Sequence, residues 1–132
     1  MAKFSSGCIR RGCTPKVNIR GIDVAGVVVS VGKQVSSFKE GDEVFGTCDG
    51  AFAEFVCGPE ANFALKPANL TLQEAATLPT SSFAALQALR DYGELRAGQS
   101  VLIIGAAGGV GTFAIQIAKA LGATVTAVWS TS

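Results

Sequence analysis

A glycine-rich stretch near the C-terminal end of this 132-residue chain has the residue types of a phosphate-binding loop. It reads GAAGGVGTF over residues 105–113, between the aliphatic run VLII and an apolar stretch of helical period. Aligned on its last two glycines, it gives Ala106-x-Gly108-x-x-Gly111, a variant of G-x-G-x-x-G with alanine in the first position. Gly108 would let the backbone approach a diphosphate, and Gly111 would let a helix pack closely on the preceding strand. The alternative is a generic glycine-rich connection in an α/β domain.

The residues around this loop indicate which dinucleotide it would bind. Backbone N–H groups near Gly109 and Val110, at the expected start of a helix, would form the anion site. An acidic residue about 20 positions further on would bind the ribose hydroxyls of NAD. This chain has Ser130 and Thr131 there instead, and hydroxyl groups accept a 2′-phosphate that a carboxylate would repel. The sequence therefore predicts NADP(H), with a frayed terminus as the alternative interpretation of Ser130–Ser132.

The cysteine and histidine content argues against metal chemistry. The chain has no histidine and no CxxC pair, and its four cysteines are Cys8, Cys13, Cys48 and Cys57. Structural zinc sites usually pair ligands two to four residues apart, so we expect no metal site and free, mostly buried thiols in a reducing compartment. The commonest general acid or base is also missing, and no proton donor or other catalytic residue is assigned.

The composition excludes several classes of partner. The chain is 48% hydrophobic and 16% charged, and its formal net charge of +1 is dispersed, so a nucleic-acid partner has no electrostatic support. The longest apolar clusters, VAGVVVSV and VLIIG, are strand-sized and fall far short of the roughly 18 residues of a membrane span. No basic segment followed by an apolar one opens the chain, so we expect no secretory signal and a cytoplasmic location.

The segment over residues 21–66 predicts small β structure with many turns. After an irregular lead-in over residues 1–20, GIDVAGVVVSVG is typical of a buried strand bounded by glycines. A turn precedes a short strand, Glu43–Phe45, and Asp49–Gly50 suits a tight hairpin turn. AFAEFVCG alternates like a half-exposed strand, and NFALKP indicates another strand ended by Pro67. Together these short strands predict a compact barrel or sandwich.

At Thr71 the period changes from that of strands to that of helices. Thr71 and Glu74 have the spacing of a capping box for a short helix. A second helix follows, with Ser81 or Ser82 as its N-cap, an apolar face and a stop at Gly93. The expected apolar face consists of Phe83, Leu86 and Leu89.

The last part of the chain predicts a β-α-β unit around the glycine-rich stretch. A strand, Val101–Ile104, leads into it, and a helix follows from Gly109 or Val110 to Leu121. A second strand, Thr124–Trp129, comes directly after that helix. The glycine-rich stretch is then the first β-to-α turn of the unit. The expected dry face of the helix consists of Val110, Ala114, Ile117, Ala118 and Leu121.

Five stretches together resemble the medium-chain dehydrogenase/reductase superfamily and, within it, the zinc-independent quinone oxidoreductase branch. They are GIDVAGVVVSVG, FKEGDEVFG, GAFAEF, LKPANLTLQEAATLP and VLIIGAAGGVGTFAIQIAKALGATVTAV, and the match extends from Gly21 to about Thr131. The resemblance implies an α/β chain: a GroES-like β-barrel over residues 1–78, partial at its N-terminus, then the first β-α-β unit of an incomplete NADP-binding Rossmann domain over residues 79–132. It also implies NADPH-dependent hydride transfer to a quinone or an α,β-unsaturated carbonyl, by an enzyme that is a homo-oligomer at full length.

The chain departs from this family at several places. Zinc-dependent members carry a histidine–glutamate pair where this chain has Ile22–Asp23, which disfavours the zinc branch. Many relatives have a threonine in place of Ala84, near the nicotinamide. Thr80 or Ser81 would approach the nicotinamide side, with helix capping as the alternative role. Family members are much longer, and two strands with one crossover cannot shield both faces of a parallel sheet, so we expect a truncated member.

Three functions fit these features. The leading hypothesis is an NADPH-dependent oxidoreductase of the quinone oxidoreductase type, acting on a small quinone or enone. The second is a non-catalytic module that binds a partner or a nucleotide and exposes apolar edges for that purpose. The third is a nonfunctional product of a truncation or frameshift. For the isolated chain we expect weak or absent turnover.

Overall fold

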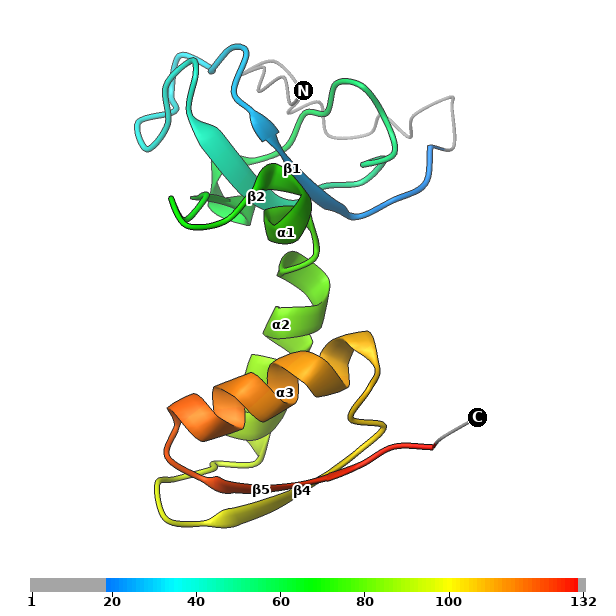
Figure 1. The fold of residues 1–132 in the computed structure, drawn as a ribbon. Coiled ribbons are helices and arrows are strands. Elements are labelled where there is room, and N and C mark those ends of the chain that lie inside the picture. Colours follow the sequence, from blue (N-terminus) through cyan, green and yellow to red (C-terminus); the bar gives the residue numbers. More distant parts are fainter. Residues whose placement is uncertain (1–18, 131–132) are drawn as a thin grey trace. The chain divides into compact units, whose positions relative to one another are not determined.

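The chain divides into two compact units, Met1–Pro79 and Thr80–Ser132, and the computed structural model describes residues 19–130 (Figure 1). Among the described residues, no helix has both the length and the apolar character needed to cross a membrane. The elements, in chain order, are β1 (Asp23–Val27), β2 (Glu43–Thr47), η1 (Glu60–Asn62), β3 (Phe63–Leu65), α1 (Leu72–Ala76), α2 (Pro79–Leu86), η2 (Gln87–Tyr92), β4 (Ser100–Ile104), α3 (Gly109–Ala120) and β5 (Thr124–Val128).

The first unit is built on an antiparallel sheet with the strand order β1-β2-β3. Phe45 in the central strand pairs with Ala25 of β1 and with Ala64 of β3. The short helix α1 packs against β1 and β2. These strands confirm the expected small β structure. Its core is enclosed by strand and loop side chains: Val28, Val44, Cys48, Val56 and Phe63.

One expected strand is absent, because residues 51–58 form an irregular segment. The start of this segment is held by backbone hydrogen bonds from Ala51 N–H to the Gly21 carbonyl (3.1 Å) and from Phe52 N–H to the Arg20 carbonyl (2.9 Å). A segment with alternating side chains forms a strand only where a neighbouring strand can form hydrogen bonds with its backbone N–H and C=O groups. Here the first two N–H groups of the segment donate to the irregular residues before β1, and no strand forms over residues 51–58, so the strand prediction is wrong.

The end of β1 and the turn after β2 also depart from the expectation. β1 ends before Val28, whose N–H donates to the Asp42 carbonyl (2.9 Å) while its carbonyl accepts from Gly41 N–H (2.9 Å). The buried strand is therefore shorter than the apolar run GIDVAGVVVSVG. The turn at Asp49–Gly50 forms, with Gly50 at φ +78°, but it leads into the irregular segment and not into a hairpin.

The capping box of α1 forms as predicted. Thr71 Oγ1 accepts a hydrogen bond from Glu74 N–H (3.2 Å), and Thr71 N–H donates to the Glu74 carboxylate (2.8 Å). Each residue thus satisfies a backbone donor of the other at the first turn. A pattern of two residues three positions apart was sufficient to locate this helix start, because every contact in it is local.

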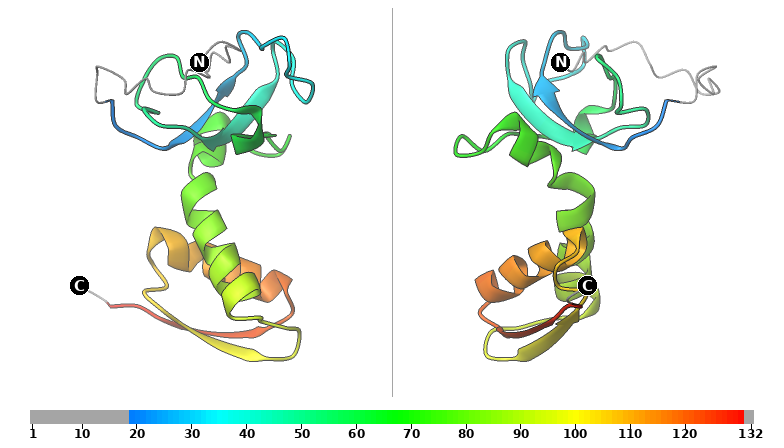
Figure 2. Two further views of the ribbon diagram at one scale, coloured as in Figure 1. Left: turned by 180° about the vertical axis from the view of Figure 1, so that it is seen from behind. Right: turned by 45° about the vertical axis from the view of Figure 1, so that its right-hand side comes forward.

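The second unit is a β-α-β arrangement. β4 and β5 are parallel, with Ser100 opposite Thr124 and Ile104 opposite Val128. α3 connects them and lies along one face of the pair (Figures 1 and 2). The expected order of strand, glycine-rich turn, helix and strand is confirmed. The core of this unit consists mainly of small side chains: Ala85, Leu89, Ile103, Ala106, Ala114 and Ala118.

The helix before β4 differs from its prediction. It begins at Pro79, where a proline costs no backbone hydrogen bond, so Ser81 and Ser82 lie inside the helix and neither is its N-cap. Phe83 is 58% exposed, whereas Ala85 and Leu89 face the core. Steps of three residues turn progressively around a helix, so Phe83 and Leu89 were wrongly placed on one face. From Gln87 to Tyr92 the helix continues in π-helical form.

α3 runs from Gly109 to Ala120, close to its predicted bounds. Of its expected dry face, Ala114 and Ala118 are buried, and Ile117 and Leu121 pack against the same core. Val110 is 45% exposed, so its assignment to the dry face is wrong. Val110 lies in the first turn of the helix, directly after the exposed residues Gly108 and Gly109.

Candidate functional site

The glycine-rich loop makes a tight turn at the end of β4. Gly105 has φ +76°, a left-handed conformation that glycine adopts without strain. The N–H groups of Gly105 and Ala106 both donate to the Val128 carbonyl, at 2.9 and 3.0 Å, which ties the loop to the end of β5. Gly108 N–H donates back to the Gly105 carbonyl (3.0 Å) and closes the turn. Ala106 is 3% exposed, so the alanine at the first motif position is part of the core.

Gly111 is where the helix rests directly on this turn. A Cβ at Gly111 would overlap the Gly105 carbonyl oxygen and lie 2.8 Å from Ala106 Cα. Both are backbone atoms, so no side-chain movement would make room for it. Glycine at this position therefore permits the close approach of α3 to the loop, which is the geometry that a dinucleotide-binding turn requires.

The first turn of α3 has no side-chain cap. Gly108 is the N-cap residue, with extended backbone (φ −75°, ψ 167°) and no side chain to accept a hydrogen bond. The first bond of the helix runs from Thr112 N–H to the Gly108 carbonyl (2.9 Å). The N–H groups of Gly109, Val110 and Gly111 precede that bond, as the initial donors of every helix do. Together with the positive end of the helix dipole, they are suited to bind an anion.

The remaining predicted site residues occupy three different places. Ser130 is exposed and lies just beyond β5; because β4 and β5 are parallel, it follows the same edge of the sheet as the glycine-rich loop. Thr131 lies outside the described residues. Thr80 is exposed near the start of α2, one residue before Ser81. The structure thus brings residues 106–111 together, in the glycine-rich loop and the first turn of α3, and places Ser130 at the same end of the strands.

Sequence reasoning gave little weight to Ser81, which the structure places beside the loop. Its Oγ lies 3.3 Å from the point that a Cβ on Gly109 would occupy. The two residues are far apart in sequence, so no local spacing signals the contact. The structure places Ser81 four residues before the buried Ala85 on the same helix face, but the burial of Ala85 could not be known from the sequence.

The buried cysteine of the first unit, Cys48, is not an activated nucleophile. Cys48 is buried and Cys57 is exposed, and neither forms a disulfide bond; Cys8 and Cys13 lie outside the described residues. Burial, with smaller effects of the charges of Asp49 and Cys57, raises the pKa of the Cys48 thiol, which keeps it protonated at neutral pH. Within residues 19–130 no three histidine, cysteine, aspartate or glutamate side chains are grouped to hold a metal ion.

A small cavity in the first unit was not anticipated from the sequence. It has a volume of about 190 Å³ and lies between β1, the segment after β2 and α1. Asp23 is its one acidic residue, and the rest of the lining is alanine and valine. The small side chains of GAFAEF and of the helix LQEAA leave this space, but nothing in their local pattern shows that the two segments meet.

Comparison with known proteins assigns the family. The model of the alcohol dehydrogenase GroES-like domain matches residues 3–68, half of the chain. The chain belongs to the alcohol dehydrogenase GroES-like domain family. Its relatives include quinone oxidoreductases and enoyl reductases, which confirms the resemblance to the medium-chain dehydrogenase/reductase superfamily.

Two curated relatives and one solved structure illustrate the similarity. The chain is 44% identical over 107 residues to the quinone oxidoreductase of Mus musculus, covering 80% of this chain and 32% of that protein. It is 39% identical over 128 residues to the NADPH-dependent alkenal/one oxidoreductase, chloroplastic, of Arabidopsis thaliana, covering 89% and 33%. The crystal structure of CurK enoyl reductase superposes with a TM-score of 0.78 at 39% identity, covering 83% and 33%. The chain therefore spans about a third of the length of these relatives.

Proposed function

We propose that this family member provides the nucleotide-binding turn of an NADPH-dependent oxidoreductase of the quinone oxidoreductase type. The observation that carries the proposal is the uncapped first turn of α3, packed through Gly111 onto a glycine turn at the carboxyl end of parallel strands. Open α/β sheets bind their ligands at this edge. The names of the relatives support a quinone or an α,β-unsaturated carbonyl as acceptor and a nicotinamide dinucleotide as donor.

The residues present fit the diphosphate of such a dinucleotide. Gly108 and Gly109 are exposed and carry no side chain, so backbone N–H groups are the first atoms an approaching anion would meet. The N–H groups of Gly109, Val110 and Gly111 would donate to the diphosphate oxygens. Once bound, the dinucleotide supplies the hydride. The protein residues bind and orient it, and that role needs neither a histidine nor a metal ligand.

The preference for NADP(H) rests on the residues after β5. No carboxylate follows the strand: the chain continues Trp129-Ser130-Thr131. A carboxylate there would repel a 2′-phosphate, whereas serine and threonine hydroxyls can donate to it. The relative from Arabidopsis thaliana is named as NADPH-dependent, which supports the same preference. Homo-oligomerisation and a cytoplasmic location stay predictions.

A second candidate function is binding without turnover. One face of the β4–β5 pair carries exposed apolar side chains beside serine and threonine: Leu102 is 59%, Ile104 is 78% and Val128 is 46% exposed. Exposed apolar surface of this kind marks association with other protein segments. Under this hypothesis the unit binds a nucleotide or a partner and contributes no reaction of its own.

A titration of the 132-residue chain separates these functions. NADPH and NADH are each titrated while cofactor fluorescence is followed, and oxidation of NADPH by a small benzoquinone is then assayed. We expect saturable binding, about tenfold tighter for NADPH, a difference of about 1.4 kcal/mol. Turnover would support the enzyme, and binding without turnover would support the binding module. Absence of saturable binding by either dinucleotide would contradict the enzyme and any nucleotide-binding role, and would leave partner binding as the remaining form of the second function.

A charge placed at the N-cap tests where the dinucleotide binds. Gly108→Asp puts a good capping side chain on the orphan N–H groups of α3, which offsets the close contact of 3.3 Å between the added Cβ and the Gly105 carbonyl oxygen, so the helix should stay formed. The same carboxylate occupies the anion site and repels a diphosphate, so NADPH affinity should fall by more than about tenfold. Lys119→Ala, at the other end of α3, is the matched control and should bind normally. Unchanged affinity in Gly108→Asp would show that the dinucleotide binds elsewhere.

A further inference from the structure

The side chain of Ser81 lies against the opening of α3. Its Oγ is 3.3 Å from the position of a Cβ built on Gly109, the first residue of that helix. Both residues belong to the second unit, so the contact does not depend on how the two units are arranged. The hydroxyl group therefore lies beside Gly109, whose N–H is one of those that precede the first hydrogen bond of α3.

The packing of α2 fixes Ser81 in this place. Ser81, Ala85 and Leu89 follow one another at intervals of four residues and thus share a helix face. Ala85 is 1% exposed and Leu89 is 9% exposed, and both belong to the core that contains Ala114 of α3. Rotation of α2 would expose these two side chains. Ser81 is consequently positioned by the core, one turn before the point where the helix becomes buried.

The hydroxyl group is available to a ligand. Within the described part of the chain, the Ser81 side chain has no hydrogen-bond partner. A serine inside a helix commonly bonds to a carbonyl of the preceding turn, and this one does not. The absence of a side chain at Gly109 also keeps the hydroxyl accessible, because a methyl group there would crowd the Ser81 oxygen. Glycine leaves open the space between the hydroxyl and the first turn of α3.

We infer that the Ser81 hydroxyl donates a hydrogen bond to the diphosphate of the dinucleotide, beside the backbone N–H groups of α3. The inference rests on the proposed function, and it assigns Ser81 to the diphosphate and not to the nicotinamide. A neutral hydroxyl is compact enough to approach an oxygen already bound by backbone donors. Ser81 is thus a binding residue contributed by α2 to a site otherwise made of backbone.

The test compares Ser81→Ala with Ser82→Ala in the 132-residue chain. Ser82 is the neighbouring serine on the same helix but points in a different direction, about 100° around the axis. We expect Ser81→Ala to weaken NADPH binding about tenfold, the scale of a hydrogen bond to a charged group. Ser82→Ala should bind like the unsubstituted chain. Inorganic pyrophosphate, used as a competitor, should lose affinity for Ser81→Ala by a similar factor.

Thermal unfolding of both variants distinguishes ligand binding from packing. Ser81→Ala should unfold at the same temperature as the unsubstituted chain, because its hydroxyl bonds to no protein group in the described residues. If the unsubstituted chain binds NADPH and Ser81→Ala binds NADPH and pyrophosphate equally well, the inference is overturned and the proposed function stands. If the unsubstituted chain binds neither NADPH nor NADH, both fall together.

Discussion

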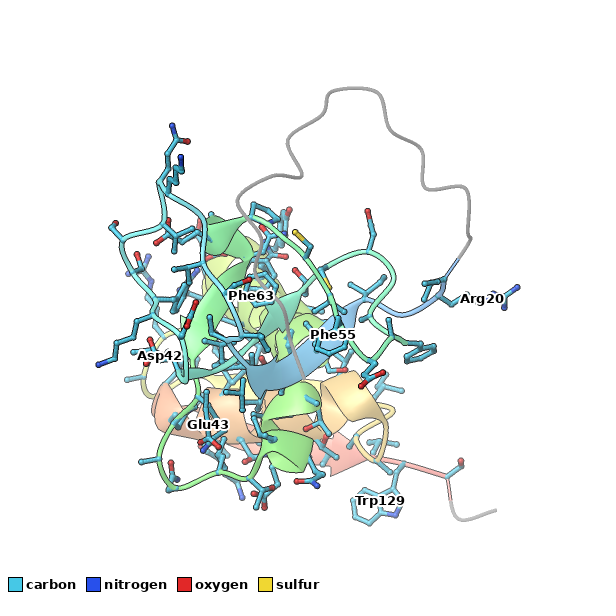
Figure 3. The ribbon with its side chains drawn as sticks, turned by 90° about the horizontal axis from the view of Figure 1, so that it is seen from above. Arg20, Asp42, Glu43, Phe55, Phe63 and Trp129 are labelled. Atoms are coloured by element: carbon cyan, nitrogen blue, oxygen red, sulfur yellow. The ribbon has the colours of Figure 1, made fainter. Side chains whose placement is uncertain are left out.

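The two units of this chain bury their apolar side chains in opposite ways. The first unit encloses Val44 and Phe63 among side chains of its antiparallel sheet and of the loops around it, including the irregular segment after β2. The second unit covers one face of β4 and β5 with α3 and leaves the other face open, where Ile104 is 78% exposed. Trp129, at the end of that sheet, points away from the remaining side chains (Figure 3).

The sizes of the core residues explain the difference. The second core is dominated by alanines, including Ala114 and Ala118, which let α3 lie close to the strands and to the glycine turn. A diphosphate site needs backbones that approach closely. The alanines that allow this approach bury less apolar area per residue than valine or phenylalanine would. The first unit thus carries the larger side chains, and the second has the geometry for binding. This contrast gives quantitative expectations for substitutions in each unit.

The largest effect on the free energy of unfolding should come from removing a large side chain from the core of the first unit. Phe63→Ala removes a side chain that is 8% exposed and should cost about 3–5 kcal/mol of the free energy of unfolding of the first unit. Phe52→Ala is the matched control, because Phe52 is 78% exposed, and it should cost less than about 1 kcal/mol. Hydrogen exchange of the β1 and β2 amides measures both. Equal losses would show that the first core is not where the structure places it.

Two adjacent isoleucines test the open face of the second sheet. Ile103 is 8% exposed and Ile104 is 78% exposed, although they are neighbours on β4. Ile103→Ala should destabilise the second unit by about 2–4 kcal/mol, and Ile104→Ala by no more than about 0.5 kcal/mol. Urea unfolding followed by fluorescence of Trp129, the single tryptophan, reports on this unit. A large loss in Ile104→Ala would mean that the outer face is covered in solution.

The smallest effect concerns pH and the capping box of α1. Hydrogen bonds from Thr71, first from its backbone N–H and then from its hydroxyl, hold the pKa of Glu74 below its usual range. Because the folded pKa is lowered, the Glu74 carboxylate stabilises the first unit above the usual carboxyl pKa, and this contribution is lost as the pH falls through the lowered value.

Acidification should therefore destabilise the unsubstituted chain slightly more than Glu74→Gln, which has no carboxylate to protonate. Exchange of the Ala75 amide, which donates to the Thr71 carbonyl at 3.0 Å, is the local reporter, measured from neutral to acidic pH. An identical pH dependence in the two proteins would argue against a stabilising role for this carboxylate.

The features predicted well from the sequence are those set by local contacts. The capping box of Thr71 and Glu74 and the start of α3 at Gly109 depend on neighbours within a few residues. The position of the glycine turn between a strand and a helix likewise follows from the order of apolar runs around it. Its ligand binding stays a prediction.

The features predicted poorly depend on distant partners. Residues 51–58 alternate like a strand, but the N–H groups of Ala51 and Phe52, at the start of the segment, donate to the carbonyls of Gly21 and Arg20. The exposure of Phe83 depends on where α2 begins and which of its faces α3 covers. The contact between Ser81 and Gly109 joins two elements that are separated by η2 and β4. No local period contains such information.

The claim that the first turn of α3 binds a diphosphate is tested most directly by amide chemical shifts. An isotope-labelled 132-residue chain is titrated with NADPH, and the backbone N–H signals are followed by NMR. We predict saturable shifts concentrated at Gly109, Val110 and Gly111, with the β1 and β2 amides unchanged. Saturable shifts located elsewhere, with these three amides unmoved, would contradict the account.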